Sequence, residues 1–194
     1  MGAPKLQSFD ELYAMIAALP EGQHGEILGP AWVRTMSRPG GRHSRVSKRA
    51  VRAFGAIDLD AGGDWWIDSE REIVFDSGKL YVPDLAGWRV SEHDDLGFVD
   101  ENPVTRLPDW ACEILSRTTQ RADRAIKLPT YAQAGVGHVW IVDLDAETIE
   151  VFAAHEGKPL LIATCRGDET VDLPPFGLPI NVQALLAKRA PKVG

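Results

Sequence analysis

Residues 110–115 read Trp-Ala-Cys-Glu-Ile-Leu, an apolar run interrupted by a single carboxylate. A short run that is apolar at nearly every position is typical of a β-strand buried on both faces. Side chains alternate between the two faces of a strand, so Glu113 should share one face with Ala111 and Leu115. We therefore place a buried strand, carrying one buried acid, at the centre of the fold.

The sequence on both sides of this strand predicts an alternation of strands and helices. After a polar turn, a helix is expected from about Thr118 to Ala134, ended by Gly135, and a second buried strand follows at 139–142. Strand, helix, strand with flanking hairpins is typical of an α/β fold with a mixed sheet. The other expected elements are a helix from Ser8 to about Leu19, a hairpin over 26–36, a helix over 42–54 with Val46, Ala50, Val51 and Phe54 as its apolar stripe, a loop over 58–64, strands at 65–68, 72–75, 79–82 and 85–90, a loop over 91–108, strands at 148–152 and 160–164, a Pro-rich loop at 174–179 and a last helix capped by Asn181.

Length and composition limit the class of protein. The 194 residues are 44% hydrophobic, and 18 glycines and 13 prolines fall short of the ~25–30% that marks disordered chains, so one domain over 1–194 is expected. No apolar run approaches the ~18 residues of a membrane span, and the first residues lack the apolar stretch of a secretory signal. With Cys112 and Cys165 as its only cysteines, the chain is expected to be cytoplasmic, with reduced thiols.

Charge is distributed unevenly along the chain. The net charge is −7, but residues 27–57 carry seven basic and no acidic side chains, while 58–109 carry 14 acidic and four basic ones. This segregation indicates an anion-binding face on an acidic body. The alternative is a solvated helix whose arginines pair with the acidic segment.

Several common catalytic motifs are absent from the sequence. It contains no GxxxxGK[ST], GxGxxG or GxSxG, and its histidines and cysteines lack the spacing of a zinc site. Cys112 lies in the middle of the apolar run, which favours a place in the core over a role as nucleophile.

Two acids remain as candidates for chemistry. A carboxylate such as Glu113 is costly to bury unless a cation or a hydrogen-bond donor meets it, and a structural salt bridge with an arginine would be one solution. Asp84 follows Pro83 at the start of the preceding strand, a position where aspartate often only forms a turn. Together, however, Asp84 and Glu113 would supply the carboxylates that Mg²⁺ prefers.

A longer set of residues carries a resemblance to a known family. The residues are Pro83-Asp84, Glu113-Ile-Leu-Ser116, Thr118, Asp123, Lys127, Tyr131, Gly135-Val136 and Trp140-Ile-Val-Asp143. In this order they resemble the Uma-two family of endonucleases, within the PD-(D/E)XK restriction-endonuclease-like superfamily. The resemblance covers most of the chain, and its specific part is 108–143. It implies a restriction-endonuclease-like fold, with a mixed central β-sheet flanked by α-helices.

The resemblance also implies metal-dependent cleavage of phosphodiester bonds in DNA. Asp84 and Glu113 would hold Mg²⁺ or Mn²⁺, and Glu26 would complete the acidic cluster. The superfamily lysine normally follows the glutamate by two residues, where this chain has Leu115. Lys127 resembles the relocated lysine of the family and would orient or activate the attacking water.

Less specific interpretations of these residues stay open. Lys127 could instead form a surface pair with Asp123, Glu26 could be a solvated acid, and His43 is assigned to the surface of the basic helix. Pro129 should kink or restart the helix that carries Lys127.

The partners expected are a DNA substrate and, as in many such nucleases, a second copy in a homodimer, but no membrane. Arg38, Arg42, Arg45 and Arg49 are the candidate DNA-binding residues. The alternative function is a non-catalytic member of the fold that binds nucleic acid or a protein.

Overall fold

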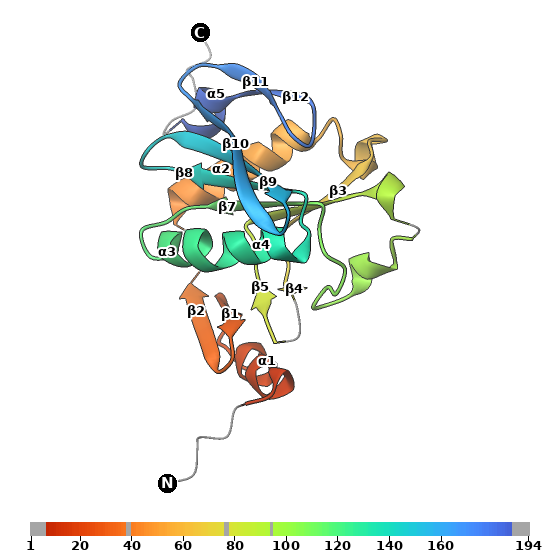
Figure 1. Cartoon of the computed structure of the whole chain (residues 1–194), viewed down its shortest axis with the longest axis vertical. Coiled ribbons are helices and arrows are strands. Elements are labelled where there is room, and N and C mark those ends of the chain that lie inside the picture. The colour runs from red at the N-terminus through yellow and green to blue at the C-terminus, as the bar shows by residue number, and fades with distance from the viewer. Residues whose placement is uncertain (1–6, 38–39, 76–77, 94, 188–194) are drawn as a thin grey trace.

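The computed structural model describes residues 7–37, 40–75, 78–93 and 95–187 (Figure 1). Its helices are α1 (Phe9–Ala17), α2 (Gly41–Phe54), α3 (Gln120–Ala122), the π-helical turn η4 (Asp123–Lys127), α4 (Leu128–Ala134) and α5 (Val182–Leu186), with short 3₁₀ turns at Leu59–Ala61, Val90–Glu92 and Gly97–Asp100. Its strands are β1 (Gln23–Gly29), β2 (Trp32–Ser37), β3 (Trp65–Ser69), β4 (Ile73–Val74), β5 (Leu80–Tyr81), β6 (Leu85–Arg89), β7 (Trp110–Ile114), β8 (His138–Asp143), β9 (Thr148–His155), β10 (Lys158–Arg166), β11 (Thr170–Leu173) and β12 (Leu178–Asn181).

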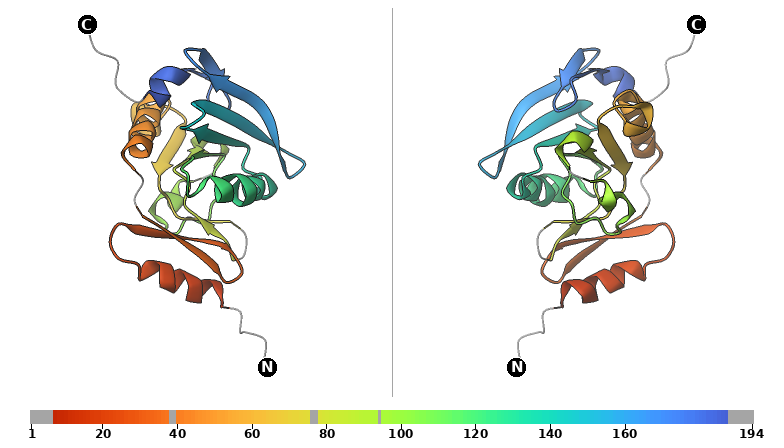
Figure 2. Two further views of the ribbon diagram at one scale, coloured as in Figure 1. Left: turned by 90° about the vertical axis from the view of Figure 1, so that its left-hand side faces the viewer. Right: turned by 90° about the vertical axis from the view of Figure 1, so that its right-hand side faces the viewer.

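The main sheet is mixed, as the sequence predicts. Its strand order is β10-β9-β8-β7-β6-β3, in which β7 and β8 run parallel and every other neighbouring pair is antiparallel. Figure 2 shows α2 (orange) and α5 (blue) on one side of this sheet and α3 with α4 (green) on the other. The α/β class, with a mixed central sheet flanked by helices, is therefore confirmed.

A smaller sheet lies at the N-terminal end of the molecule. Its strand order is β2-β1-β5-β4, and the hairpin of β1 and β2 places Glu26 opposite Arg34. The helix α1 begins at Ser8, whose side chain and that of Glu11 form the capping box expected from the sequence. Figure 2 shows α1 lying against the small sheet, and Leu12 and Ile16 of this helix are buried there. The first segment thus folds as predicted and brings Glu26 against the connection between β5 and β6.

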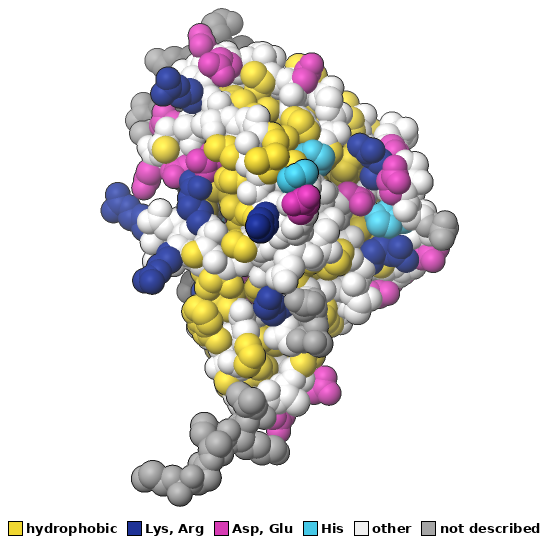
Figure 3. All heavy atoms as spheres, in the orientation of Figure 1, with side chains coloured by type: hydrophobic (Ala, Val, Ile, Leu, Met, Phe, Trp, Pro, Cys, Tyr) yellow, Lys and Arg dark blue, Asp and Glu magenta, His cyan; other side chains and the backbone are white. Residues whose placement is uncertain are grey.

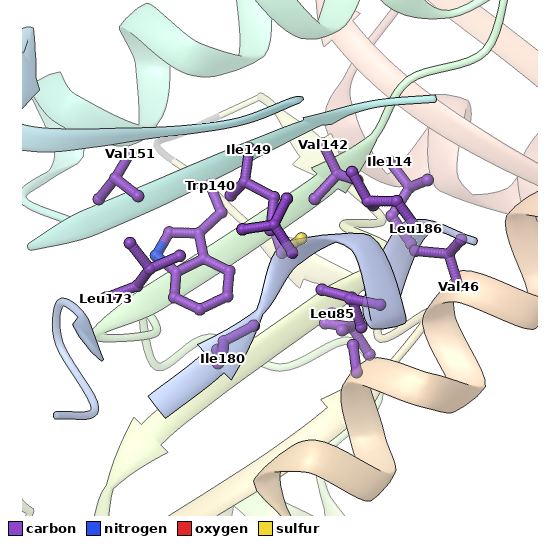
Figure 4. Packing of buried hydrophobic residues seen from close by; sticks show 14 of the residues in the cluster. Val46, Leu85, Ile114, Trp140, Val142, Ile149, Val151, Leu173, Ile180 and Leu186 are labelled. Carbon is purple, nitrogen blue, oxygen red and sulfur yellow. The ribbon is translucent and has the colours of Figure 1, made fainter. Parts of the chain in front are cut away.

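The alternation expected along β7 is confirmed. Trp110, Cys112 and Ile114 pack in the hydrophobic cluster beneath α2, whereas Ala111 and Leu115 pack in the cluster on the opposite face. Figure 4 shows the first cluster, where side chains from β7, β8 and β9 meet those of α2, β12 and α5. Glu113 therefore points into the half of the core that the helical segment 120–134 covers.

This helical segment is not one regular α-helix. The turn η4 separates α3 from α4, and Pro129 is the second residue of α4. The sequence predicts a kink or a restart near Pro129; the backbone stays helical through Lys127 and Leu128, but it changes there from the wide π turn to an α-helix. Gly135 ends α4 with φ at +95°, which glycine adopts without strain.

Two details of the predicted elements are wrong. Val51 is 45% exposed, so the buried stripe of α2 consists of Val46, Ala50 and Phe54. The strand β12, which pairs with β11 in a hairpin, is not predicted: residues 174–177 of the expected Pro-rich loop are a turn, but 178–179 already belong to this strand. Periodicity does not predict this hairpin, because prolines are uncommon within strands. Its inward residues, Leu173 and Ile180, nevertheless pack in the core.

The strand β10 forms the outer edge of the main sheet. Leu160, Leu161 and Ile162 are each about half exposed there, and Figure 3 shows hydrophobic side chains (yellow) gathered on the face that carries β10 in Figure 1. Within the described residues, no helix is long and apolar enough to cross a membrane.

Candidate active site

Glu113 is the buried acid around which the site forms. It is 3% exposed, and Lys127 Nζ lies 2.5 Å from its Oε1. The hydroxyl of Tyr131 donates a hydrogen bond to the same oxygen. Burial raises the pKa of Glu113 well above its ordinary value, and the ammonium of Lys127 opposes this rise. The cation that meets Glu113 is thus a lysine of the neighbouring helical segment, in place of the arginine considered from sequence.

Lys127 is 1% exposed, so its assignment as a surface lysine is wrong. Its Nζ lies 2.8 Å from Glu26 Oε1 and 3.9 Å from Asp123 Oδ1. Burial alone would lower the pKa of Lys127, but the surrounding carboxylates of Glu113, Glu26 and Asp123 raise it above its ordinary value. Lys127 is therefore a fixed cation at neutral pH.

Glu26 is fully buried, so its interpretation as a solvated acid is also wrong. Its Oε1 faces Lys127 and accepts a hydrogen bond of 2.9 Å from the backbone N–H of Val82, while its Oε2 pairs with Arg34 Nη2. Burial alone would raise the pKa of Glu26, but Lys127 and Arg34 together hold it below its ordinary value. Both oxygens face protein groups, which makes Glu26 an anchor for Lys127.

Asp84 lies immediately before β6, where the backbone holds it. Its Oδ2 accepts a hydrogen bond of 2.6 Å from the N–H of Ile114, and its Oδ1 lies 3.0 Å from Nε2 of His43. The assignment of His43 to the surface is wrong, since its side chain is only 12% exposed. Burial would lower the pKa of His43, but the hydrogen bond and charge of Asp84 raise it.

A cavity of about 580 Å³ brings these groups together. Asp84 and Glu113 both line it, as the pairing of β6 with β7 predicts: Leu85 lies opposite Cys112, so Asp84 reaches the level of Glu113. The other charged or titratable residues of the lining are His24, Arg34, His43, Glu70, Asp123 and Lys127.

Carboxylates outnumber permanent cations in this region. The acids that are buried here or line the cavity are Glu26, Glu70, Asp84, Glu113 and Asp123, and the permanent cations are Lys127 and Arg34. Among the described residues, no three His, Cys, Asp or Glu side chains are already gathered as a metal site. Mg²⁺ needs only one or two carboxylates besides water and phosphate, so the oxygen donors of Asp84 and Glu113 fit such an ion.

The arginines expected to bind DNA lie in several places. Arg42 pairs with Glu147 at 3.2 Å and Asp145 at 3.9 Å, and Arg49 donates to the backbone oxygens of Leu185 and Ala187. Arg45 is exposed on α2, and Arg38 lies outside the described residues. The sequence left open that the arginines of this segment pair with the acidic segment 58–109, but the partners found for Arg42 and Arg49 lie outside it.

Sequence reasoning missed the places of Arg34, His43 and Tyr131. Arg34 lies directly across the hairpin from Glu26, a pairing that the hairpin register contains. His43 precedes Val46 by three residues, so it lies on the buried face of α2, which helical spacing could have shown. Tyr131 follows Lys127 by four residues, so helical spacing could have placed both side chains on the face toward Glu113.

Comparison with known proteins gives a family match and structural neighbours. A family model, Uma2, described as "Putative restriction endonuclease", matches residues 9–183. A solved structure titled as a "putative nuclease belonging to DUF820" from Anabaena variabilis ATCC 29413 has a TM-score of 0.72, with 19% sequence identity over 93% of this chain and 97% of that chain. No curated protein matches the chain. At this identity the solved structure shows the shared fold.

Proposed function

The chain belongs to the Uma2 family, and from this premise we propose that it is a Mg²⁺- or Mn²⁺-dependent endonuclease that hydrolyses phosphodiester bonds of DNA. One observation carries the proposal: the buried Lys127 lies beside Glu113 in the cavity that Asp84 also lines. This supplies the cation that the motif lacks at Leu115, which is itself buried in the apolar core.

Asp84 and Glu113 are the residues that would hold the divalent ion. When bound, the ion stabilises charge on the phosphate and lowers the pKa of an attacking water. The backbone N–H of Ile114 and the ring of His43 orient Asp84, and the hydroxyl of Tyr131 orients Glu113. These contacts preorganise both carboxylates before substrate arrives.

Lys127 has a different task. Its raised pKa excludes it as a general base at neutral pH, so it acts as a positive charge fixed at the cavity wall. Such a charge stabilises the phosphate oxygens as they gain charge during attack. Glu26 keeps the ammonium in place from behind.

The test is cleavage of supercoiled plasmid and of single-stranded DNA in Mg²⁺, Mn²⁺ or EDTA. Wild type should cleave only with metal, whereas Asp84→Asn and Glu113→Gln should cleave at least ~100-fold more slowly. Asp172→Asn, an exposed acid on β11, is the matched control and should cleave like wild type. Mg²⁺ should also raise the unfolding temperature of wild type but not that of Glu113→Gln.

No cleavage by wild type under any metal, together with DNA binding that metal leaves unchanged, would contradict the proposal. That result would favour the non-catalytic alternative, a nucleic-acid-binding member of the same fold.

A further inference from the structure

A second hollow, of about 510 Å³, adjoins the catalytic cavity. The two share His43 and Glu70, so a chain molecule that occupies one can continue into the other. The wall of the second hollow is a stripe of α2 together with the end of β3. Besides the shared residues, its lining consists of Ser44, Ser47, Lys48, Val51, Arg52 and Ser69.

The cations of this hollow differ from the other basic residues of the segment. Lys48 and Arg52 are exposed, and in the part of the chain that the structure describes neither side chain makes an ion pair or hydrogen bond. By contrast, Arg42 and Arg49 are engaged with acids or with backbone oxygens. The acid in the lining is Glu70, which lies 3.9 Å from His24 Nε2. The hollow is therefore cationic and rich in hydroxyl groups.

A third hollow, of about 590 Å³, borders His43 at the start of α2, and its positive charges are balanced by acids. Its cations, Arg42 and Arg117, lie 3.9 and 3.6 Å from the carboxylate of Asp145, and Asp143 also lines it. These acids neutralise the arginines and repel phosphate. A polyanion that crosses the catalytic cavity should therefore continue into the second hollow rather than into the third.

We propose that Lys48, Arg52 and Ser47 form a subsite for a backbone phosphate that flanks the cleaved bond. The inference rests on the proposed function and adds the path of the substrate strand, which leaves the catalytic cavity along α2. Lysine, arginine and serine are the side chains that most often bind the sugar–phosphate backbone, and such contacts carry no base preference. The ligand class is therefore a nucleic-acid strand bound independently of its sequence.

Binding of a short fluorescent oligonucleotide, single-stranded or duplex, tests the subsite in EDTA, where no metal supports cleavage. Each phosphate contact contributes roughly 0.7–0.9 to the slope of log affinity against log salt concentration. The double variant Lys48→Gln/Arg52→Gln, which empties the subsite for one phosphate, should therefore lose about 0.7–0.9 from the slope that wild type shows. Lys158→Gln/Arg166→Gln removes the same charge from exposed positions on β10 and should leave the slope unchanged. Equal slopes for wild type and the first variant, or no DNA binding by wild type, would overturn the inference.

Cleavage kinetics in Mg²⁺ separate this inference from the proposed function. The Lys48→Gln/Arg52→Gln protein should show a KM raised about tenfold and a kcat within about twofold of wild type, because a flanking phosphate binds equally in ground and transition states. A reduced salt slope without cleavage by any variant would support the subsite and refute the nuclease. Normal cleavage with an unchanged slope and KM would refute the subsite and leave the nuclease standing.

Discussion

Glu26, Lys127 and Glu113 form a chain of buried charges in which the lysine is shared. Lys127 Nζ lies 2.8 Å from Glu26 and 2.5 Å from Glu113, so two carboxylates share its single positive charge. A buried charge that loses its partner destabilises a protein by roughly 3–5 kcal/mol. The residues that aim Lys127 are therefore also residues on which folding depends.

Replacing Glu26 by Gln should lower the free energy of unfolding by roughly 3 kcal/mol at pH 7. Because the pKa of Glu26 is lowered by folding, its contribution is present above its ordinary pKa of 4.5 and is lost as the pH falls below that value. The wild-type protein should thus lose stability below about pH 4.5, and Glu26→Gln should show a flatter curve there.

Urea unfolding between pH 3 and pH 7 measures this effect. Glu21→Gln changes an exposed acid of the same N-terminal region and should follow the wild-type curve. Parallel curves for Glu26→Gln and wild type would show that Glu26 is not held as an ion by Lys127 and Arg34.

At the scale of elements, the π turn η4 decides which way Lys127 points. The turn is wider than a regular α-helical turn, and within it Asp123 and Lys127 are buried while Ala125 between them is exposed. Pro129 follows directly, as the second residue of α4.

Deletion of Ala125 should convert η4 to a regular α-helical turn. We expect a folded protein that cleaves DNA at least ~100-fold more slowly, because the shortened turn moves the ammonium of Lys127 relative to Glu113 and Glu26. Circular dichroism and plasmid cleavage measure the two properties, with Ala125→Ser as the control of unchanged length. A shortened chain that cleaves like wild type would show that the π turn is dispensable.

The elements also show what local patterns can predict. The β7 strand, its two faces and the helices α1 and α2 follow from alternation, capping and spacing, because each depends on neighbouring residues. The hairpin of β11 and β12 does not, since its prolines mask a strand that only the core defines. The acids Asp84 and Glu113 could be paired from sequence, whereas the contact of Lys127 with Glu26 could not, since it joins distant segments of the chain.

At the scale of the whole molecule, part of the basic segment of the sequence lines the catalytic cavity and the second hollow. Arg34, of the basic segment, lies inside the catalytic cavity, while Lys48 and Arg52 line the adjoining groove of α2. The net charge of the whole chain is −7, but this overall negative charge does not prevent a local cationic site for a polyanion. The expected homodimer stays a prediction.

The central claim is that Lys127 takes the place of the motif lysine. The most direct measurement is the Mg²⁺-dependent rate at which Lys127→Met nicks supercoiled plasmid, relative to Lys158→Met on β10. Methionine keeps the length of the buried side chain, and the Mg²⁺-induced rise in unfolding temperature reports whether the metal site survives. We predict a rate at least ~100-fold lower for Lys127→Met, with that rise retained, and a wild-type rate for Lys158→Met. Equal rates for the two variants would contradict the claim.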